Sequence, residues 1–219
     1  MSPFLDAREA SEVRERVARL EAATGIESVT AVIARADSYP EIPWKAFALG
    51  ASLSALVTAA WAWHEPGWEA SAAVVRTVVA VLAAGGAAAL ATMWIAPFAR
   101  LFLPRAHREV EVLQYAQALF LERELFKTRR HDGILLLVSL FERQVAVVAD
   151  HGVRDKVGAN KLASVVAAVT SRIADGEIKD AMVAGLERLE EVLLAHGFSG
   201  APGRRNEIPD DVVQQRGSS

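Results

Sequence analysis

Two short segments of the sequence hold the residues best suited to bind a cation. They contain His131 and Asp132, and then Asp150, His151 and Asp155 further along the chain. Carboxylate oxygens are ligands for calcium or magnesium, and imidazole nitrogens are ligands for zinc. The sequence therefore suggests a divalent cation, calcium or magnesium, as a cofactor. The alternative is that these residues are ordinary turn formers in solvated loops.

The segments beside these residues predict a β-hairpin that brings them together. Residues 133–140 are apolar except for Ser139, which is typical of a strand covered on both faces. Residues 144–149 follow after a turn at Glu142 and Arg143 and are a suitable antiparallel partner. Because the start of one antiparallel strand lies beside the end of the next, we expect the five candidate ligands at one end of the sheet.

Other catalytic signatures are missing from the sequence. We find no glycine-rich phosphate loop, no zinc-binding pair of histidines at helical spacing and no nucleophile elbow. The chain has no cysteine, which excludes disulfides and cysteine nucleophiles. A net charge of −3 gives no positive field for a nucleic-acid backbone. Nucleic acid is therefore not an expected partner, and a phosphatase would lack an evident nucleophile.

Both charged parts of the chain contribute to one predicted α/β domain. Helices are expected at 6–23, 105–128, 160–174 and 177–195, and a further strand at 28–34. A helix separates strands 28–34 and 133–140, which favours parallel pairing through a right-handed crossover. The N-terminal part alone has one helix and one strand and could not bury their apolar faces. The two parts should therefore share one small mixed sheet.

Residues 44–103 predict a hairpin of two transmembrane helices. The expected spans, 46–63 and 77–99, would be roughly 27 Å and 34 Å long as helices, which suits the hydrocarbon core of a bilayer. Trp44, Trp61, Trp63 and Trp68 are expected at the membrane interfaces. The alternative is a pair of buried core helices in a soluble protein, which these flanking tryptophans disfavour.

Basic residues predict the orientation of this hairpin. Arg35, Lys45, Arg100, Arg105 and Arg108 flank its outer ends, whereas Arg76 alone lies near its turn. Under the positive-inside rule both termini are cytoplasmic, and the chain is a multi-pass protein of the inner (cytoplasmic) membrane. The lipid bilayer is then its first partner.

Small residues recur at intervals of four on both expected spans. They are residues 46, 50, 54 and 58 on the first and 80, 84, 88, 92 and 96 on the second. Such faces allow helices to approach closely. They serve either to pack the hairpin against itself or to join a second copy of the chain.

The chain is thus expected to have four parts. Residues 1–43 supply the first helix and strand, 44–103 the transmembrane hairpin, 104–197 the rest of the domain, and 198–219 a flexible tail. In this topology the turn at Glu142 and Arg143 faces the membrane. The candidate cation ligands lie at the opposite end of the domain.

Several segments resemble the TPM-domain family, specifically its bacterial members with a membrane insertion. They are Thr24-Gly25-Ile26, Asp37-Ser38-Tyr39-Pro40, residues 133–143, Asp150-His151-Gly152-Val153 and residues 206–210. The resemblance implies a three-layer α/β/α sandwich, interrupted here by the hairpin. Some members of the family are credited with phosphatase activity and divalent-ion binding, and others with the assembly or repair of membrane complexes.

Two functions agree with these features. The first is a membrane-anchored TPM-like domain that serves as an interaction or assembly and maintenance module at the cytoplasmic membrane. Its partner would be another membrane protein or a second copy of the chain. The alternative is a divalent-metal-dependent phosphatase that uses the cluster of aspartates and histidines.

Overall fold

A computed structural model describes residues 4–64, 70–174, 177–200 and 211–217 of the 219-residue chain. The chain divides into two compact units. The first combines residues 1–37 with 106–219, and the second consists of residues 38–105. The first unit, which is discontinuous in sequence, contains the sheet. The second contains the most apolar helices.

The sheet of the first unit has four strands in the order β3-β2-β1-β4. Strands β1 (Glu27–Arg35) and β2 (Gly133–Ser139) are parallel, and β3 (Gln144–Ala149) is antiparallel to β2. Both pairings agree with the sequence, because a helix separates β1 from β2 and a short turn joins β2 to β3. The α/β fold class with a mixed sheet is confirmed.

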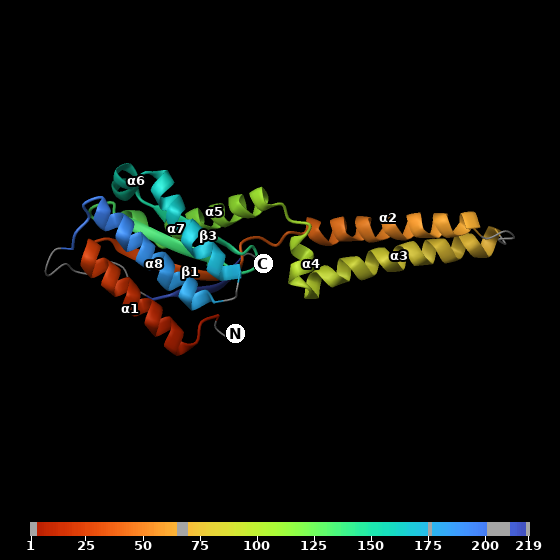
Figure 1. Cartoon of the computed structure of the whole chain (residues 1–219), viewed down its shortest axis with the longest axis horizontal. Helices are drawn as coiled ribbons and strands as arrows, with labels where there is room; N and C mark the ends of the chain where they lie inside the picture. Colours follow the sequence, from red (N-terminus) through yellow and green to blue (C-terminus); the bar gives the residue numbers. More distant parts are fainter. Residues whose placement is uncertain (1–3, 65–69, 175–176, 201–210, 218–219) are drawn as a thin grey trace. The chain divides into compact units, whose positions relative to one another are not determined.

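Helices cover this sheet on both faces. In chain order they are α1 (Ala7–Thr24), α5 (Arg105–Glu122), α6 (His151–Val157), α7 (Ala159–Ala174) and α8 (Ile178–Ala195), with a 3₁₀ turn η1 (Leu125–Lys127) after α5. In Figure 1, α1 and α8 lie side by side over the sheet. Most of these elements lie where hydrophobic periodicity predicts them.

Successive side chains of each central strand point into two different hydrophobic cores. Val32 and Leu136 belong to the core shared with α1, α7 and α8. Their neighbours Ile33 and Leu135 belong to the core that α5 covers. Since strand residues alternate between faces, a strand that is apolar along its whole length must be covered on both. The unit is therefore a three-layer α/β/α sandwich.

Helix α1 begins and ends where its sequence indicates. The carboxyl group of Asp6 accepts a hydrogen bond from the N–H of Glu9 at 2.7 Å, and the Glu9 carboxyl group accepts one from the N–H of Asp6 at 2.9 Å. This capping box satisfies two N–H groups that the first turn leaves without partners. Gly25, at φ 70°, ends the helix in the left-handed conformation.

Two details of the expected helices differ in the structure. Helix α5 ends at Glu122 instead of continuing to residue 128. Glu124 adopts a left-handed conformation with φ 55°, which turns the chain so that Leu125 is fully buried in the core beneath α5. Helix α6 was not expected. It has seven residues, too few for periodicity to reveal it.

Residues 211–217 are not the loose tail that the sequence suggests. Strand β4 (Val213–Gly217) pairs in parallel with β1 at the edge of the sheet. Gln214 Oε1 accepts hydrogen bonds from the N–H groups of Phe4 and Leu5, at 2.7 and 3.1 Å. These contacts between distant parts of the chain stabilise a strand whose own composition is mostly polar. The rest of the expected tail includes 201–210 and 218–219, which lie outside the described residues.

The second unit contains α2 (Glu41–His64), α3 (Ala70–Trp94) and the short helix α4 (Ala96–Arg100). Helices α2 and α3 form an antiparallel hairpin (Figure 1). Both are long and apolar enough to cross a membrane. Only 6% of the apolar window of α2 and 11% of that of α3 is buried inside the structure.

The second expected span extends past the end of its helix. Helix α3 ends at Trp94, and the chain leaves helical geometry at Ile95, with φ −109° and ψ 84°, before α4 begins. Pro97 explains the break, because proline has no N–H and its ring collides with the carbonyl group four residues earlier. The continuous apolar helix therefore stops five residues short of residue 99.

Small residues form the contact between α2 and α3. A Cβ atom on Gly50 would lie 2.8 Å from the carbonyl oxygen of Ala84 and 2.9 Å from the Cβ of Ala88. A Cβ atom on Gly85 would likewise lie 2.8 Å from two carbon atoms of the Phe47 ring. Only residues without a large side chain permit this approach. Of the two uses predicted for these faces, packing within the hairpin is the one that the structure contains.

Candidate functional site

Three of the five candidate cation ligands meet at one end of the sheet. Strands β2 and β3 are paired with Ile134 opposite Ala149, so the loop before β2 lies beside the residues that follow β3. The Nδ1 atom of His131 is 3.2 Å from Asp150 Oδ2, and the Nδ1 atom of His151 is 3.0 Å from Asp150 Oδ1. The centres of the two imidazole rings are 4.4 Å apart. We call these three residues the His-Asp-His cluster.

The environment of Asp150 favours its charged form. Desolvation alone would raise the pKa of Asp150, but the hydrogen bonds from the backbone and imidazole of His151 and from His131 outweigh it and lower the pKa below its usual value. The Asp150 side chain is 12% exposed, whereas the imidazoles of His131 and His151 are 50% and 54% exposed. The cluster therefore presents a charged carboxylate between two imidazoles that solvent reaches.

The backbone holds the two loops of the cluster together. The N–H of Gly152 donates to the carbonyl oxygen of His131 at 3.0 Å, and the N–H of Asp150 donates to that of Gly133 at 2.9 Å. A Cβ atom on Gly152 would lie 2.5 Å from the His131 carbonyl oxygen, so this close approach requires glycine. His131 adopts φ 52°, which a residue other than glycine rarely does. The loop conformation is therefore set by specific contacts.

Asp132 and Asp155, the other two candidate ligands, are not in this cluster. Asp132 is 2% exposed, and its carboxyl group lies 3.7 Å from the Nε atom of Arg130. Its backbone N–H donates to Thr128 Oγ1 at 3.0 Å. Asp155 is exposed on α6, one turn beyond His151. Sequence proximity alone could not separate these two aspartates from the cluster.

The turn between β2 and β3 contains a buried acid that sequence reasoning treated only as a turn residue. Glu142 is 0% exposed. Its carboxyl group accepts a hydrogen bond from the N–H of Ala36 at 2.9 Å and one from the hydroxyl group of Ser139. Arg143 beside it is exposed, at φ 52°. Glu142 thus ties the end of β1 to this turn, and the membrane-facing position expected for the turn stays a prediction.

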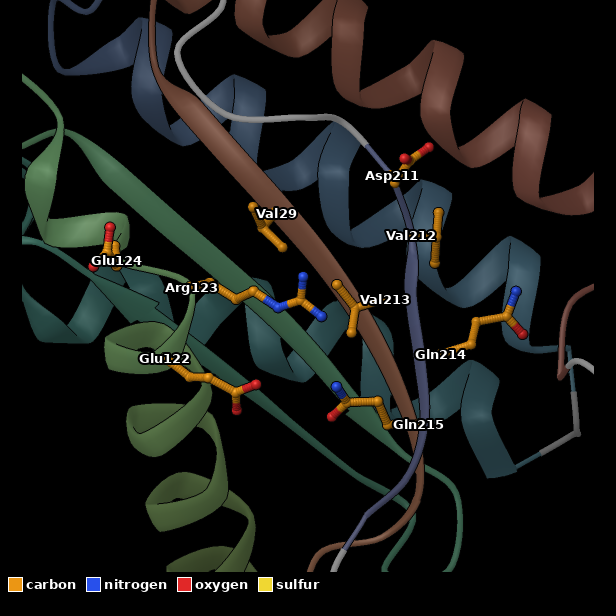
Figure 2. Close-up of a pocket in the computed structure, with 9 residues that line it drawn as sticks. All are labelled: Val29, Glu122, Arg123, Glu124, Asp211, Val212, Val213, Gln214 and Gln215. Atoms are coloured by element: carbon orange, nitrogen blue, oxygen red, sulfur yellow. The ribbon is translucent and has the colours of Figure 1, made fainter.

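A pocket of about 560 Å³ lies between the C-terminal end of α5 and the edge strand β4 (Figure 2). Figure 2 shows the side chain of Arg123, in the turn after α5, extending toward Val213 and Gln215. The residues that line it are Val29, Glu122, Arg123, Glu124, Asp211, Val212, Val213, Gln214 and Gln215. Sequence reasoning missed this pocket because it did not predict β4. The pocket shares no residue with the His-Asp-His cluster.

Three of the four expected interfacial tryptophans lie at opposite ends of α2. Trp44 is 74% exposed at its start, and Trp61 and Trp63 are 64% and 90% exposed near its end. Trp44 and Trp61 are seventeen positions apart, about 26 Å along a helix. Trp68 lies outside the described residues.

Comparison with known proteins supports the fold and the family. Residues 96–192 match the family described as the TPM domain. The NMR structure of the BA42 protein from the psychrophilic bacterium Bizionia argentinensis is similar, with a TM-score of 0.58 and 13% sequence identity over 98% of this chain and 97% of that chain. At this identity the likeness shows the fold alone. No curated protein matches this chain. The expected resemblance to the TPM domain is therefore confirmed over residues 96–192.

Proposed function

We propose that the α2–α3 hairpin anchors the first unit, residues 1–37 and 106–219, in the cytoplasmic membrane. We call it the TPM-domain unit, since it holds most of the matched segment 96–192. There it serves as an interaction module for the assembly or maintenance of a membrane complex. The observation that carries the anchor is the outward direction of the hairpin's large apolar side chains. Leu53, Leu56, Val75 and Leu82 are between 54% and 68% exposed. In water such a surface would be strongly unfavourable, whereas a bilayer covers it.

The contact between the two helices supports lipid as the surrounding medium. Gly50 and Gly85 lie in the contact between α2 and α3. The large aliphatic side chains of both helices therefore remain on the outside of the hairpin. Channels and transporters usually carry ionisable groups in the middle of their spans. The central parts of both spans contain no Asp, Glu, Lys or Arg. An anchor agrees better with this composition than a conduction pathway does.

The flanking charges support a cytoplasmic TPM-domain unit. Arg35 and Lys45 precede the hairpin and Arg100, Arg105 and Arg108 follow it, against Arg76 near its turn. The positive-inside rule then places both ends in the cytoplasm. The hairpin turn would lie on the opposite side of the membrane.

Single cysteines test this topology, because the natural chain has none. We expect a membrane-impermeant maleimide to label His64→Cys, at the exposed end of α2, from the periplasmic side only. Arg188→Cys, exposed on α8, should be labelled only in inverted vesicles. Leu53→Cys in the middle of α2 should resist labelling from both sides. Labelling of residues 64 and 188 from the same side would contradict the proposal.

Helix α5 supports the interaction role. Its inner face lies in the core, yet Val110, Leu113 and Leu121 on the outer face are 49%, 43% and 61% exposed. Their spacing of three and eight residues places them on one side of a helix. Exposed apolar surface of this kind is typical of protein interaction sites. A second membrane protein is the proposed occupant.

Purification in a mild detergent tests this role. The full chain should carry a second membrane protein in fixed stoichiometry, and the double change Leu113→Glu with Leu121→Glu should remove it. Leu194→Glu is the matched control, because Leu194 is an exposed leucine on α8, 47% exposed. A chain recovered only with itself, or equal loss in the control, would contradict the assembly role.

The His-Asp-His cluster favours a second candidate function, a divalent-metal-dependent phosphatase. A bound cation can activate water at neutral pH, so such an enzyme does not need a serine or cysteine nucleophile. The test is hydrolysis of a simple phosphate ester with calcium, magnesium or zinc. Activity that disappears when Asp150 is changed to Asn would favour the enzyme. Absence of hydrolysis with all three cations would rule it out for that ester.

A further inference from the structure

The His-Asp-His cluster has the ligand spacing of a transition-metal site. The candidate ligand atoms of His131, Asp150 and His151 all lie within 4.8 Å of one another, and each Nδ1 atom is 3.0 to 3.2 Å from a carboxylate oxygen. In a tetrahedral zinc site with bonds of about 2.0–2.1 Å, neighbouring ligand atoms are roughly 3.3 Å apart. The two nitrogen-to-oxygen separations, each to a different oxygen of Asp150, are close to this value, and the two imidazole nitrogens lie within 4.8 Å of each other.

We propose that His131, Asp150 and His151 bind one divalent cation of the zinc class through two imidazole nitrogens and one carboxylate oxygen. This site goes beyond the anchoring role and does not depend on it. Three protein ligands leave a fourth tetrahedral position, and the half-exposed imidazoles leave it open to solvent. Such an open position is typical of zinc sites that bind water or a small ligand.

The ligand set disfavours the calcium or magnesium that the sequence alone suggested. Calcium takes six to eight oxygen ligands, and magnesium prefers octahedral oxygen coordination. Two of the three ligands here are imidazole nitrogens, which suit zinc, copper, nickel and iron. Asp132 and Asp155 would have added oxygens, but they are not in the group that the described residues form. The structure therefore changes the expected class of cation.

Backbone hydrogen bonds hold the ligands in place before a cation arrives. The hydrogen bonds Gly152 to His131 and Asp150 to Gly133 join the two loops. The N–H of His151 also donates to Asp150 Oδ1 at 2.7 Å, which fixes the carboxylate. A preorganised site spends less of its binding free energy on ordering its ligands. The competing explanation is that Asp150 only accepts hydrogen bonds from two imidazoles and that no cation binds.

Metal titration of the full chain separates these explanations. The protein is purified in detergent without an oligohistidine tag, stripped with a chelator, and titrated with Zn²⁺, Mg²⁺ and Ca²⁺ by calorimetry. We expect one Zn²⁺ per chain, bound at least about 100-fold more tightly than Ca²⁺, as the ligand preferences predict. Co²⁺ in place of Zn²⁺ should give the strong visible absorption of four-coordinate cobalt. Equal affinity for Zn²⁺ and Ca²⁺ would overturn the proposal.

Substitutions locate the bound ion. His131→Ala, His151→Ala and Asp150→Asn should each weaken Zn²⁺ binding at least about tenfold, because each removes one ligand group. Asp150→Asn keeps the shape and the N-cap of α6, so its effect does not come from loss of folding. His107→Ala and Asp155→Asn are the controls, since both residues lie outside the cluster. Unchanged binding in Asp150→Asn, or equal loss in the controls, would show that Zn²⁺ binds elsewhere or adventitiously.

Discussion

The two units of this chain place the same kinds of residue in opposite positions. In the first unit, which contains the sheet, leucines such as Leu136 lie in the interior, 1% exposed. In the hairpin unit, leucines such as Leu56 lie on the outside, 68% exposed, and glycine and alanine occupy the contact between helices. The first pattern suits water as the surrounding medium, and the second suits lipid. One chain therefore follows two sets of packing rules.

A substitution common to both units gives the largest expected contrast between them. Leu136→Ala should lower the free energy of unfolding by about 2–5 kcal/mol, because it leaves a cavity in the core between the sheet and α8. Leu56→Ala should change it by no more than about 0.5 kcal/mol, since no core is disturbed. Urea unfolding of the full chain in detergent micelles, followed by circular dichroism, measures both. A large loss in Leu56→Ala would mean that the outer face of α2 packs against protein.

Glycine substitutions examine the hairpin from its inner side. Gly50→Leu should destabilise the α2–α3 hairpin by about 1–3 kcal/mol. The reason is that a Cβ atom at this position would already lie 2.8 Å from the carbonyl oxygen of Ala84, which is too close for a carbon atom. Gly86→Leu is the control in the same pair of helices, since nothing lies within 4 Å of a Cβ there. Thermal unfolding and cross-linking of cysteines introduced in α2 and α3 report the effect. Equal tolerance at both positions would refute the close approach.

Local signals made the first unit's central elements predictable. Asp6, Glu9 and Gly25 mark the ends of α1, and residues 133–140 show the buried strand β2. The antiparallel hairpin then places His131 near Asp150, so most of the candidate site follows from the sequence. These features depend on neighbouring residues, which sequence patterns report well.

Contacts between distant residues explain what the sequence did not predict. Strand β4 has no alternating apolar pattern, and its Gln214 is held by the N-terminal residues Phe4 and Leu5. Glu142 reads as a turn residue, yet its hydrogen bond to Ala36 buries it. Asp155 was grouped with Asp150 because α6, which carries it to an exposed position, was not predicted. Tertiary contacts override local preference in each case.

Glu142 tests how much a buried polar contact stabilises the first unit, beside the apolar contacts of its core. Glu142→Ala should lower the free energy of unfolding by about 1–3 kcal/mol, because it leaves the buried N–H of Ala36 without its partner. Glu142→Gln retains a side-chain oxygen and should cost less. Denaturant unfolding of the two variants beside the natural chain gives the comparison. If Glu142→Ala and an exposed change such as Glu187→Ala cost the same, the buried carboxyl group would have no stabilising role.

Thr30→Val has the smallest expected effect, and unlike the other changes it should stabilise the protein. Its hydroxyl group is buried, with the residue 1% exposed, and has no hydrogen-bond partner among the described residues. Thr30→Val keeps the shape and removes the unsatisfied group, so it should raise the free energy of unfolding by about 1 kcal/mol. Thr58→Val in α2 is the control, because its hydroxyl group donates to the carbonyl oxygen of Ser54 at 2.9 Å and that bond would be lost. An increased melting temperature at position 30 but not at position 58 would agree with the interior of the first unit preferring apolar groups. A decrease at position 30 would mean that its hydroxyl group has a partner, such as a buried water.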